Sequence, residues 1–158
     1  MADLQEIEAI KRLKYRYLRC LDEKRWEEMT ECFTADATSA YGDGDYSFAG
    51  RDQIVQFLRE ALGSPSIISA HRVQQPEIDL TSATTATGVW ALDDTVMHTE
   101  SKSIIRGAAF YHDEYVKIGG QWKIKSTGYQ RLFEERLSRV DTPSWRLTAN
   151  RWAKGEKQ

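Results

Sequence analysis

Two kinds of apolar spacing divide this sequence, and their order limits the folds that it can adopt. Apolar side chains recur at helical spacing over three early segments, at about residues 4–22, 26–34 and 51–62. The first segment carries Ile10, Tyr17 and Leu21 on one side, and the third stops at a Gly-Ser-Pro sequence. The early part of the chain therefore predicts three helices, of which the first two form a hairpin.

Strand-like patterns follow, and they cover residues 67–80, 84–99, 104–118 and 121–131. Turn signals at Ser82-Ala83 and Gly119-Gly120 separate neighbouring runs, and the glycine pair is the stronger hairpin signal. Helices followed by antiparallel strands are typical of the α+β class. We therefore expect a curved, mainly antiparallel sheet wrapped around the N-terminal helices, which encloses a cone-shaped cavity open at one end.

Smaller patterns complete this prediction. Residues 38–41 and 46–48 flank a turn rich in Gly and Asp, which predicts a β-hairpin. Residues 132–137 predict a short helix after the last strand. The tail beyond it carries Trp145 and Trp152, which we expect to dock onto the domain or onto a neighbouring subunit.

Length and charge indicate one ordinary globular unit. The 158 residues suffice for one core but not for two, so we predict a single domain over 1–158 with a core at about 5–135 and a tail at 136–158. A formal net charge of −2 gives no electrostatic reason to expect nucleic acid. No apolar run approaches the length of a membrane span, and residues 1–20 are charged and amphipathic, so we expect a cytoplasmic protein.

Cysteine and histidine usage argues against a metal site. Cys20 and Cys32 fall on predicted helical segments without CxxC spacing, which favours buried free thiols. His71, His98 and His112 have unrelated spacings and form no HxH or HExxH motif. We therefore expect neither a metal ion nor another cofactor.

Five polar residues fall where a compact domain would place apolar side chains. They are Tyr17, Asp22, His71, Asp94 and Arg131. A phenol, two carboxylates, an imidazole and a guanidinium that converge in one apolar pocket can carry out proton transfer without a cofactor. We take these five residues as the candidate catalytic set. The candidate substrate contacts are Trp90, Leu92, Phe110, Trp122 and Tyr129.

Asp94 and His71 are central to this hypothesis. Asp94 shares a strand face with Trp90 and Leu92, because side chains alternate with a period of two, so its carboxylate must be paired or have a raised pKa. His71 is placed to approach Asp94 across one strand pair, and Asp94 would then orient the imidazole as a base. The alternatives are that Asp93 faces inward instead, or that both acids lie in a solvated turn.

The first helix contributes two of the candidates. Tyr17 and Asp22 are five residues apart, so they diverge on an ideal helix unless Asp22 lies at its end. Tyr17 would donate a hydrogen bond to a substrate oxygen, with Asp22 in contact with Tyr17 or with the substrate. Alternatively, Tyr17 is a core aromatic residue and Asp22 caps the turn. The charged face of this helix, with Lys11, Arg12 and Lys14, is interpreted as solvated surface.

Arg131 has the opposite strand parity to Trp122 and Ile124, and a bulge at Gly128 would turn it inward. In the pocket it would bind a substrate carboxylate or pair with Asp22. A surface salt bridge is the alternative.

These residues also carry a family resemblance. The run from Ile7 to Asp22, followed by Trp26, resembles the opening of SnoaL-like proteins of the nuclear transport factor 2-like superfamily. Further matches are His71, Pro76-Glu77-Ile78, Thr84-Thr85-Ala86-Thr87-Gly88-x-Trp90, Asp94, Gly107-Ala108-Ala109-Phe110-Tyr111, Gly120-Gln121-Trp122 and Thr127-Gly128-Tyr129-x-Arg131. The similarity covers roughly residues 5–135, and within that group it resembles the bile-acid 7α-dehydratases.

The resemblance implies a cone-shaped α+β barrel and a lyase that removes water, without a cofactor, from a steroid-like or other polycyclic or aromatic hydroxylated substrate. It implies that Tyr17 hydrogen-bonds a substrate oxygen, that His71 is the general acid and base, and that Asp94 orients His71. Asp22 and Arg131 would be further pocket residues. A homo-oligomer is also implied, with a trimer favoured over a dimer.

Other activities on the same scaffold remain alternatives. The scaffold hosts double-bond isomerases of the steroid type, epoxide hydrolases and noncatalytic ligand-binding or assembly modules. An acid and base at His71 beside Tyr17 modestly favours dehydration. The sequence departs from the bile-acid enzymes at Arg72, Val73 and Gln74, which leaves the substrate open.

Overall fold

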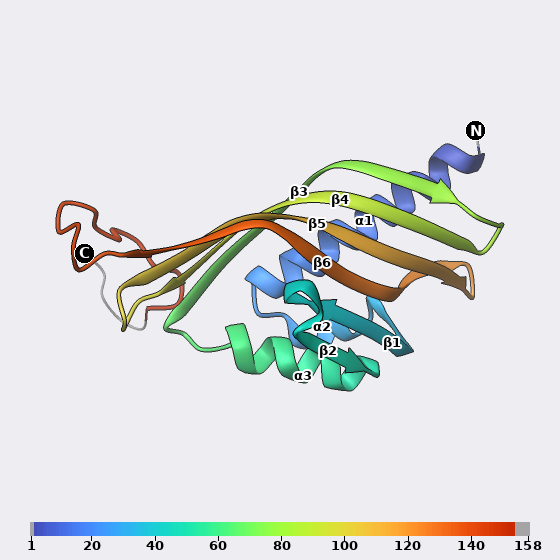
Figure 1. Cartoon of the computed structure of the whole chain (residues 1–158). Coiled ribbons are helices and arrows are strands. Elements are labelled where there is room, and N and C mark those ends of the chain that lie inside the picture. Colours follow the sequence, from blue (N-terminus) through green and yellow to red (C-terminus); the bar gives the residue numbers. More distant parts are fainter. Residues whose placement is uncertain (1, 154–158) are drawn as a thin grey trace.

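Three α-helices lie in the first 62 residues of the chain, with two strands between the second and the third, and a computed structural model describes the chain from residue 2 to residue 153 (Figure 1). The helices are α1 (Ala2–Asp22), α2 (Trp26–Thr30) and α3 (Arg51–Leu62). Spacings of three and four residues put Ile10, Leu13, Tyr17 and Leu21 on one side of α1, and all four are buried. Burial of such a face, at about 1.5–3 kcal/mol per large apolar side chain, fixes the helix against the sheet.

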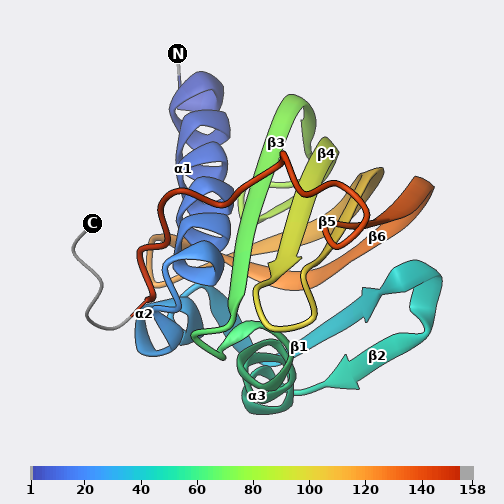
Figure 2. The same ribbon diagram turned by 90° about the vertical axis from the view of Figure 1, so that its left-hand side faces the viewer.

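Six strands form one sheet in the order β2-β1-β6-β5-β4-β3. Their bounds are β1 (Phe33–Tyr41), β2 (Tyr46–Ala49), β3 (Ile67–Leu80), β4 (Thr85–His98), β5 (Ser103–Ile118) and β6 (Gln121–Ser138). All neighbours pair antiparallel except β1 and β6, which pair parallel. Figures 1 and 2 show the long strands curving around the space that α1 and α3 border. The α+β class and the cone-shaped, mainly antiparallel sheet are thereby confirmed.

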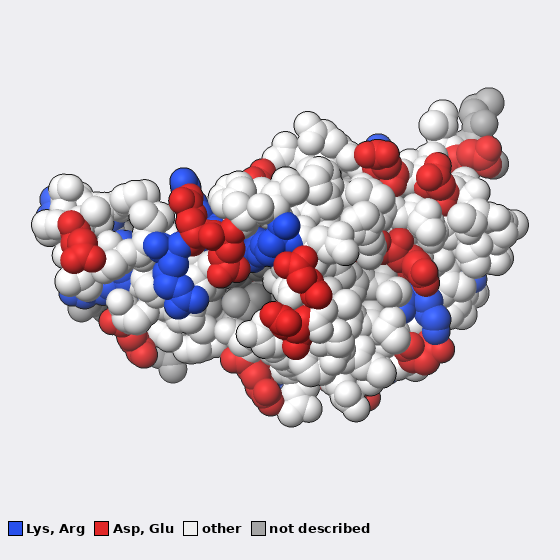
Figure 3. Space-filling model, viewed as in Figure 1, with Lys and Arg blue, Asp and Glu red and all other residues white. Residues whose placement is uncertain are grey.

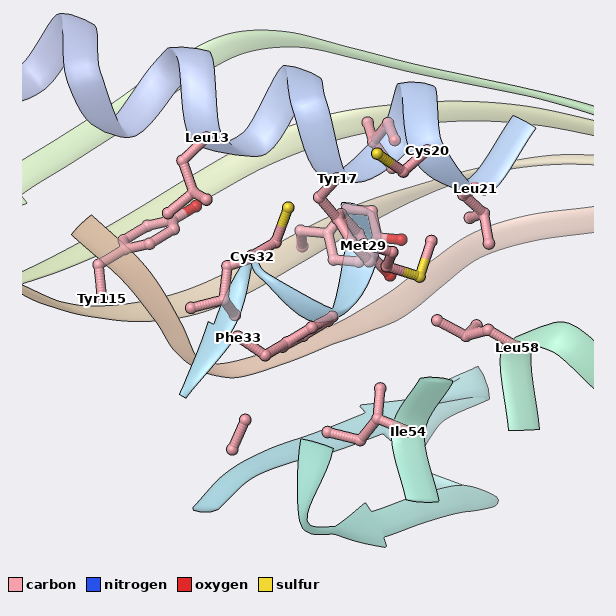
Figure 4. Packing of buried hydrophobic residues seen from close by; sticks show 14 of the residues in the cluster. Leu13, Tyr17, Cys20, Leu21, Met29, Cys32, Phe33, Ile54, Leu58 and Tyr115 are labelled. Atoms are coloured by element: carbon pink, nitrogen blue, oxygen red, sulfur yellow. The ribbon is translucent and has the colours of Figure 1, made fainter. Parts of the chain in front are cut away.

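The core lies between the helices and the concave side of the sheet. Figure 4 shows Leu13 and Tyr17 pointing from α1 toward the strands, with Tyr115 of β5 facing Leu13. The ring of Tyr17 meets the ring of Phe33 edge to face, with centroids 5.5 Å apart. Ile54 of α3 is fully buried and closes the core on the side of that helix. This packing fixes α1 against the strands.

The second helix is shorter than predicted. α2 ends at Thr30, Cys32 lies in the turn that follows, and Phe33 begins β1. The reason is sheet pairing, because Phe33 pairs with Ile124 of β6 and the Ile124 amide donates to the Cys32 carbonyl at 2.8 Å. Cys20 and Cys32 are both free and buried, as predicted.

The predicted helix at 132–137 is wrong, because β6 continues as a strand to Ser138. Its extension pairs with the start of β5, for example Ile104 with Leu137. A partner strand that offers a full ladder of hydrogen bonds outweighs the weak helical preference of a six-residue segment. In Figure 1 the ends of β4, β5 and β6 project beyond the helices.

The C-terminal segment returns from this projection to the end of α1 (Figure 2). Arg151 Nη1 lies 3.3 Å from Glu23 Oε1, and Lys24 Nζ lies 5.2 Å from the ring centroid of Trp152. Trp152 therefore docks onto the domain, as predicted, whereas Trp145 remains 56% exposed. Among the helices described, none combines the length and the apolar character that crossing a membrane requires.

Candidate active site

A cavity of about 460 Å³ opens between α1, α3 and the concave side of the sheet. Its wall is mostly aromatic and aliphatic, from residues such as Tyr17, Leu21, Phe57, Leu58 and Tyr111. The polar residues in the wall, apart from tyrosines, are His71, Asp94, His98, Arg131 and Glu134. An apolar cavity of this size with a few converging polar groups is the usual form of a small-molecule site. Four of the five predicted catalytic residues therefore line it, and Asp22 contacts one of them.

Asp22 is the carboxylate that holds His71. Asp22 Oδ1 lies 2.7 Å from His71 Nδ1 and accepts from Ser69 Oγ at 2.8 Å, while Oδ2 accepts from the backbone amide of His71 at 2.7 Å. Asp22 is the last residue of α1, so the divergence from Tyr17 expected on an ideal helix does not restrict it. The predicted alternative that Asp22 only caps a turn, and the predicted contact with Tyr17, are both wrong.

The position of β3 explains why this contact forms. β3 is the edge strand of the sheet and pairs only with β4, so alternate backbone amides point away from the sheet. The amide of His71 is one of these, and the carboxylate at the end of α1 accepts its hydrogen bond. Ser69 and His71 are two residues apart, so their side chains leave the strand on the same side and reach the same carboxylate.

This geometry assigns the proton on the imidazole. An ionised carboxylate only accepts hydrogen bonds, so Nδ1 of His71 carries a proton, and in the neutral imidazole Nε2 carries the free lone pair. Burial raises the pKa of Asp22, but the hydrogen bonds and charge of His71 and the bond from Ser69 outweigh it, and the net pKa is lowered. His71 lines the cavity, so Nε2 is the ring nitrogen available to a substrate there.

Asp94 does not orient His71, which corrects the sequence prediction. The two residues are direct cross-strand partners, so the predicted proximity is correct. Asp94 is instead held by Arg131, with Nη1 to Oδ1 at 2.5 Å and Nη2 to Oδ2 at 3.0 Å. A guanidinium presents two parallel donors that match a carboxylate, which an imidazole cannot do. Asp94 faces inward as predicted, and the alternatives for Asp93 and for a solvated turn are wrong.

Arg131 is fixed by this pair rather than by Asp22. Its Nη2 also lies 3.5 Å from Glu134 Oε2. Burial alone lowers the pKa of Arg131, but the hydrogen bonds and charge of Asp94 outweigh it and raise the pKa. The predicted pairing with Asp22 and the alternative of a surface salt bridge are both wrong, because only 15% of the Arg131 side chain and 6% of the Asp94 side chain are exposed.

A bulge turns Arg131 inward, although not at the predicted Gly128. The register of β6 against β5 shifts between Ile124 and Ser126, so Lys125 is an extra residue. Thr127, and with it Arg131 four residues on, then lie on the same side as Ile124. Gly128 allows the backbones of β6 and β1 to approach closely in their parallel pair, because a Cβ at this position would lie 2.4 Å from the Ala40 carbonyl oxygen.

Tyr17 shares its hydroxyl with a second phenol. Tyr17 Oη lies 3.1 Å from Tyr41 Oη, and both residues line the cavity. Burial raises the pKa of Tyr17, as do the phenols of Tyr111 and Tyr41 beside it. Both tyrosines therefore stay protonated and can donate hydrogen bonds at neutral pH. Tyr41 was not predicted, because a tyrosine in a short hairpin strand gives no signal of the wall that it faces.

Of the predicted substrate contacts, only Tyr129 lines the cavity. Trp90 is fully buried in the core and donates from Nε1 to Tyr115 Oη at 3.0 Å. Leu92 belongs to the same core and lies outside the cavity wall. Both share the face of Asp94, but they precede it in β4, where Tyr15 of α1 meets Trp90 edge to face with ring centroids 6.0 Å apart.

Phe110 and Trp122 are also wrong as cavity contacts. Phe110 points to the outer face of the sheet and is 38% exposed, because its neighbours in β5 take the inward positions. Trp122 lies toward the other end of the molecule, where its Nε1 donates to Glu6 Oε2 at 2.6 Å.

Two further residues shape the site and were not predicted. Gly107 pairs with Asp94 across β4 and β5, and a Cβ there would lie 2.7 Å from Arg131 Nη1. Its lack of a side chain lets the guanidinium reach Asp94. In the sequence, a glycine in the middle of a predicted strand is the feature that indicates such a close approach. Lys14 is not on the solvated surface as predicted, since it is fully buried with Nζ 2.7 Å from Asp113 Oδ2.

Charges on the outer surface are mixed. Figure 3 shows Lys and Arg interspersed with Asp and Glu on the face in view, most densely where the projecting strands leave the body. The described residues on this face thus form a surface of both signs.

Comparisons with known proteins agree with this architecture. The family model of the SnoaL-like domain matches residues 2–128. A provisionally assigned scytalone dehydratase from Novosphingobium aromaticivorans has 26% sequence identity and a TM-score of 0.78, with 85% of this chain and 91% of that chain covered.

Two hexachlorocyclohexane dehydrochlorinases share the fold at lower identity. The type 2 enzyme LinA has 20% identity and a TM-score of 0.76, with 86% of this chain and 91% of that chain covered. The type 3 enzyme from Novosphingobium barchaimii has 19% identity and a TM-score of 0.76, with 85% and 92% covered. At these identities the likeness concerns the fold alone.

Proposed function

Because the chain belongs to the SnoaL-like domain family, whose fold serves small-molecule enzymes and ligand-binding proteins, we propose that it is a cofactor-independent dehydratase. It would remove water from a hydroxylated, largely apolar substrate by acid and base catalysis at His71. Two kinds of structural neighbour support this class of reaction by name. One is a provisionally assigned dehydratase, and the others are dehydrochlorinases, and both names describe the removal of a proton and a leaving group.

The observation that carries the proposal is the hydrogen bond between Asp22 and His71 at the cavity wall. It leaves Nε2 of His71 as a base in an apolar space, with its ring orientation fixed by three hydrogen bonds on Asp22. A histidine that served only to satisfy the core would have no reason to keep a free ring nitrogen beside a cavity. Asp22 thus takes the orienting role that the sequence assigned to Asp94.

The proposed reaction begins with proton removal. His71 Nε2 takes the proton from a carbon next to a ketone or enone, and the electron pair of that C–H bond moves into the conjugated system. Negative charge develops on the ketone oxygen, where the hydroxyl of Tyr17 donates a hydrogen bond. The Asp22 carboxylate stabilises the imidazolium that forms.

Loss of the hydroxyl completes the reaction. The electron pair returns from the oxygen to form the carbon–carbon double bond, and the C–O bond breaks with its electrons on the departing oxygen. The proton on Nε2 moves to that oxygen, so water leaves and His71 returns to its starting state. One imidazole therefore serves both proton transfers, and no oxidant or reductant is needed.

The cavity favours a neutral, polycyclic substrate. Its volume of about 460 Å³ lies within the range of drug-sized ligand sites. Asp94 neutralises Arg131, so the wall offers little net charge to attract a substrate carboxylate. We propose a hydroxylated steroid or a comparable fused-ring ketone, as the resemblance to bile-acid 7α-dehydratases suggests.

A substrate screen tests this proposal. Hydroxylated steroid ketones and aromatic ketones are incubated with the protein, and the new conjugated double bond is followed by absorbance and by the loss of one water in the mass spectrum. His71→Asn keeps a polar group near Asp22 but removes the base, so turnover should fall by about 10²- to 10⁴-fold. His112→Asn, at an exposed position of β5, is the matched control and should retain activity.

Other outcomes separate the alternatives. A product that keeps its hydroxyl but has a shifted double bond would indicate an isomerase, which needs only a base and an oxygen-binding donor. Ligands that bind without turnover would indicate a noncatalytic module. A folded His71→Asn protein with full activity would exclude the proposed role of this residue.

A further inference from the structure

The molecule contains a buried ion pair that the proposed mechanism does not use. Lys14 of α1 and Asp113 of β5 lie 2.7 Å apart between Nζ and Oδ2, and both side chains are 0% exposed. A buried pair of charges seldom stabilises a fold more than apolar side chains of the same volume would. A pair of charges in the centre of an apolar core therefore indicates a role that depends on the groups that each charge faces.

The two charges face different groups. Asp113 accepts hydrogen bonds from two core residues. Thr127 Oγ1 donates to its Oδ1 at 2.7 Å, and Tyr115 Oη donates to its Oδ2 at 2.6 Å. Tyr115 in turn accepts from Trp90. These bonds hold the carboxylate in one place, as a buried ionised acid requires.

The ammonium group of Lys14 faces the cavity tyrosines. Its Nζ lies 3.4 Å from the ring centroid of Tyr111 and 5.1 Å from that of Tyr17. Lys14 Nζ donates no well-aligned hydrogen bond among residues 2–153, so its contacts are the carboxylate and two aromatic faces. Both tyrosines belong to the cavity wall, and Tyr17 bonds with Tyr41 there.

The pair thus forms a fixed dipole whose positive end faces the aromatic rings of Tyr111 and Tyr17. The separation of 5.1 Å runs from Nζ to the ring centroid of Tyr17, and in an interior of low dielectric constant a positive charge at this range strongly affects the energy of negative charge that develops near the ring. Such a dipole is already oriented before the reaction begins, so its effect requires no reorganisation. Lys14 does not line the cavity and hence acts through the tyrosines rather than on a substrate directly.

We propose that Lys14, held by Asp113, is a positioning residue that orients the Tyr17–Tyr41 phenol pair and stabilises negative charge on a substrate oxygen bound to it. This inference rests on the proposed function, since it deepens the role of Tyr17 as the donor to that oxygen. It predicts that the site stabilises the negative oxygen of the intermediate and so lowers the pKa of a bound hydroxyl group, and that this effect comes from a residue one helical turn before Tyr17.

Binding of 2-naphthol tests the proposal without any turnover. This planar aromatic alcohol fits an apolar cavity, and its neutral and ionised forms differ in absorbance and fluorescence. The pKa of the bound naphthol reports directly how far the site stabilises a negative oxygen. The measurement is made on the full chain and its variants, so a failed dehydratase screen would leave its outcome readable.

Two variants separate electrostatics from packing. Lys14→Met keeps the side-chain volume but leaves Asp113 as an uncompensated negative charge. The pKa of bound naphthol should therefore rise by more than about one unit, which is a tenfold fall in the ratio of ionised to neutral ligand. Lys14→Met with Asp113→Asn removes both charges, so the rise should be smaller than in the single variant. This double variant also avoids an unpaired buried acid, which protects the test if the single variant does not fold.

Control variants define the remaining outcomes. Lys11→Met removes a charge from a partly exposed position of the same helix and should leave the pKa of bound naphthol unchanged. Tyr17→Phe should raise that pKa, because the donor is lost. The proposal is overturned if any folded Lys14→Met protein binds naphthol with the wild-type pKa. It is also overturned if the double variant shifts that pKa as far as the single variant, or if Tyr17→Phe has no effect.

Discussion

At the scale of single residues, the site depends on which carboxylate meets which cation. The sequence identifies the polar residues, and the cross-strand pairing of His71 with Asp94 is correct. It cannot show that the end of α1 delivers Asp22 to the free edge of β3, because that contact depends on how the helix packs across the sheet. The imidazole and the guanidinium therefore exchange the partners that the sequence suggests.

The first prediction concerns Asp22. Asp22→Asn preserves size and can still accept one hydrogen bond, but its amide would donate to His71 Nδ1 and move the imidazole proton to Nε2. The base would then face the cavity already protonated, so kcat should fall by about 10³- to 10⁴-fold. Asp52→Asn on α3, whose side chain is 89% exposed, is the control. Unchanged kcat in folded Asp22→Asn protein would contradict this role.

The second prediction concerns the Asp94 and Arg131 pair. Arg131→Met leaves a buried carboxylate without a partner and should lower the free energy of unfolding by roughly 3 kcal/mol. Asp94→Leu combined with Arg131→Met removes both charges and should cost less than either single change. Urea denaturation measures all three variants. Additive losses in the double variant would show that the two side chains are not coupled in this way.

At the scale of elements, the local sequence pattern predicts most helices and strands, and it fails where pairing with another strand determines the secondary structure. The bounds of β3 match the predicted 67–80, because alternating side chains and a Ser-Ala turn define it locally. The segment 132–137 carries no comparable signal, and it becomes strand only because β5 is there to pair with it. The bulge at Lys125, which turns Arg131 inward, is likewise set by the register between two strands.

The third prediction concerns Gly107 in mid-strand. A Cβ at this position would lie 2.5 Å from the Phe133 carbonyl oxygen and 2.7 Å from Arg131 Nη1. Gly107→Ala should therefore displace the guanidinium, lower the free energy of unfolding by about 1–3 kcal/mol and reduce kcat.

Gly120→Ala, where nothing lies within 4 Å of the added Cβ but φ is +80°, is the control. It should cost about 1 kcal/mol from backbone strain and leave kcat unchanged. Equal kcat in both variants would contradict the assigned role of Gly107.

At the scale of the whole molecule, a polar network crosses an otherwise apolar core. It runs from the cavity phenols through Lys14 and Asp113 to Trp90. The sequence does not reveal it, because Lys14 falls among exposed basic residues and its burial depends on the strands above it. The predicted homo-oligomer stays a prediction, which sedimentation of the purified protein would test.

The fourth prediction follows from the tyrosines in this network. Burial raises the pKa of Tyr17, Tyr41, Tyr111 and Tyr115 above the ordinary value of 10.0. Above that pH the unfolded chain loses these phenol protons while the folded chain keeps them, so the free energy of unfolding must fall as pH rises. Each tyrosine should contribute roughly 1 kcal/mol per pH unit to the decline.

Two lysines oppose this trend and do not reverse it. Burial lowers the pKa of Lys14 and of Lys24 below 10.5, against the effects of Asp113 and Asp22, so the folded chain loses those protons first and adds stability as pH rises toward 10.5. Two such groups stand against four tyrosines. Urea denaturation between about pH 8 and about pH 11 should therefore show a steep loss of stability above pH 10 that Tyr111→Phe makes shallower by one proton. A midpoint that stays constant over this range would mean that the phenols ionise in place, and that the interior around Lys14 is wetter than its packing indicates.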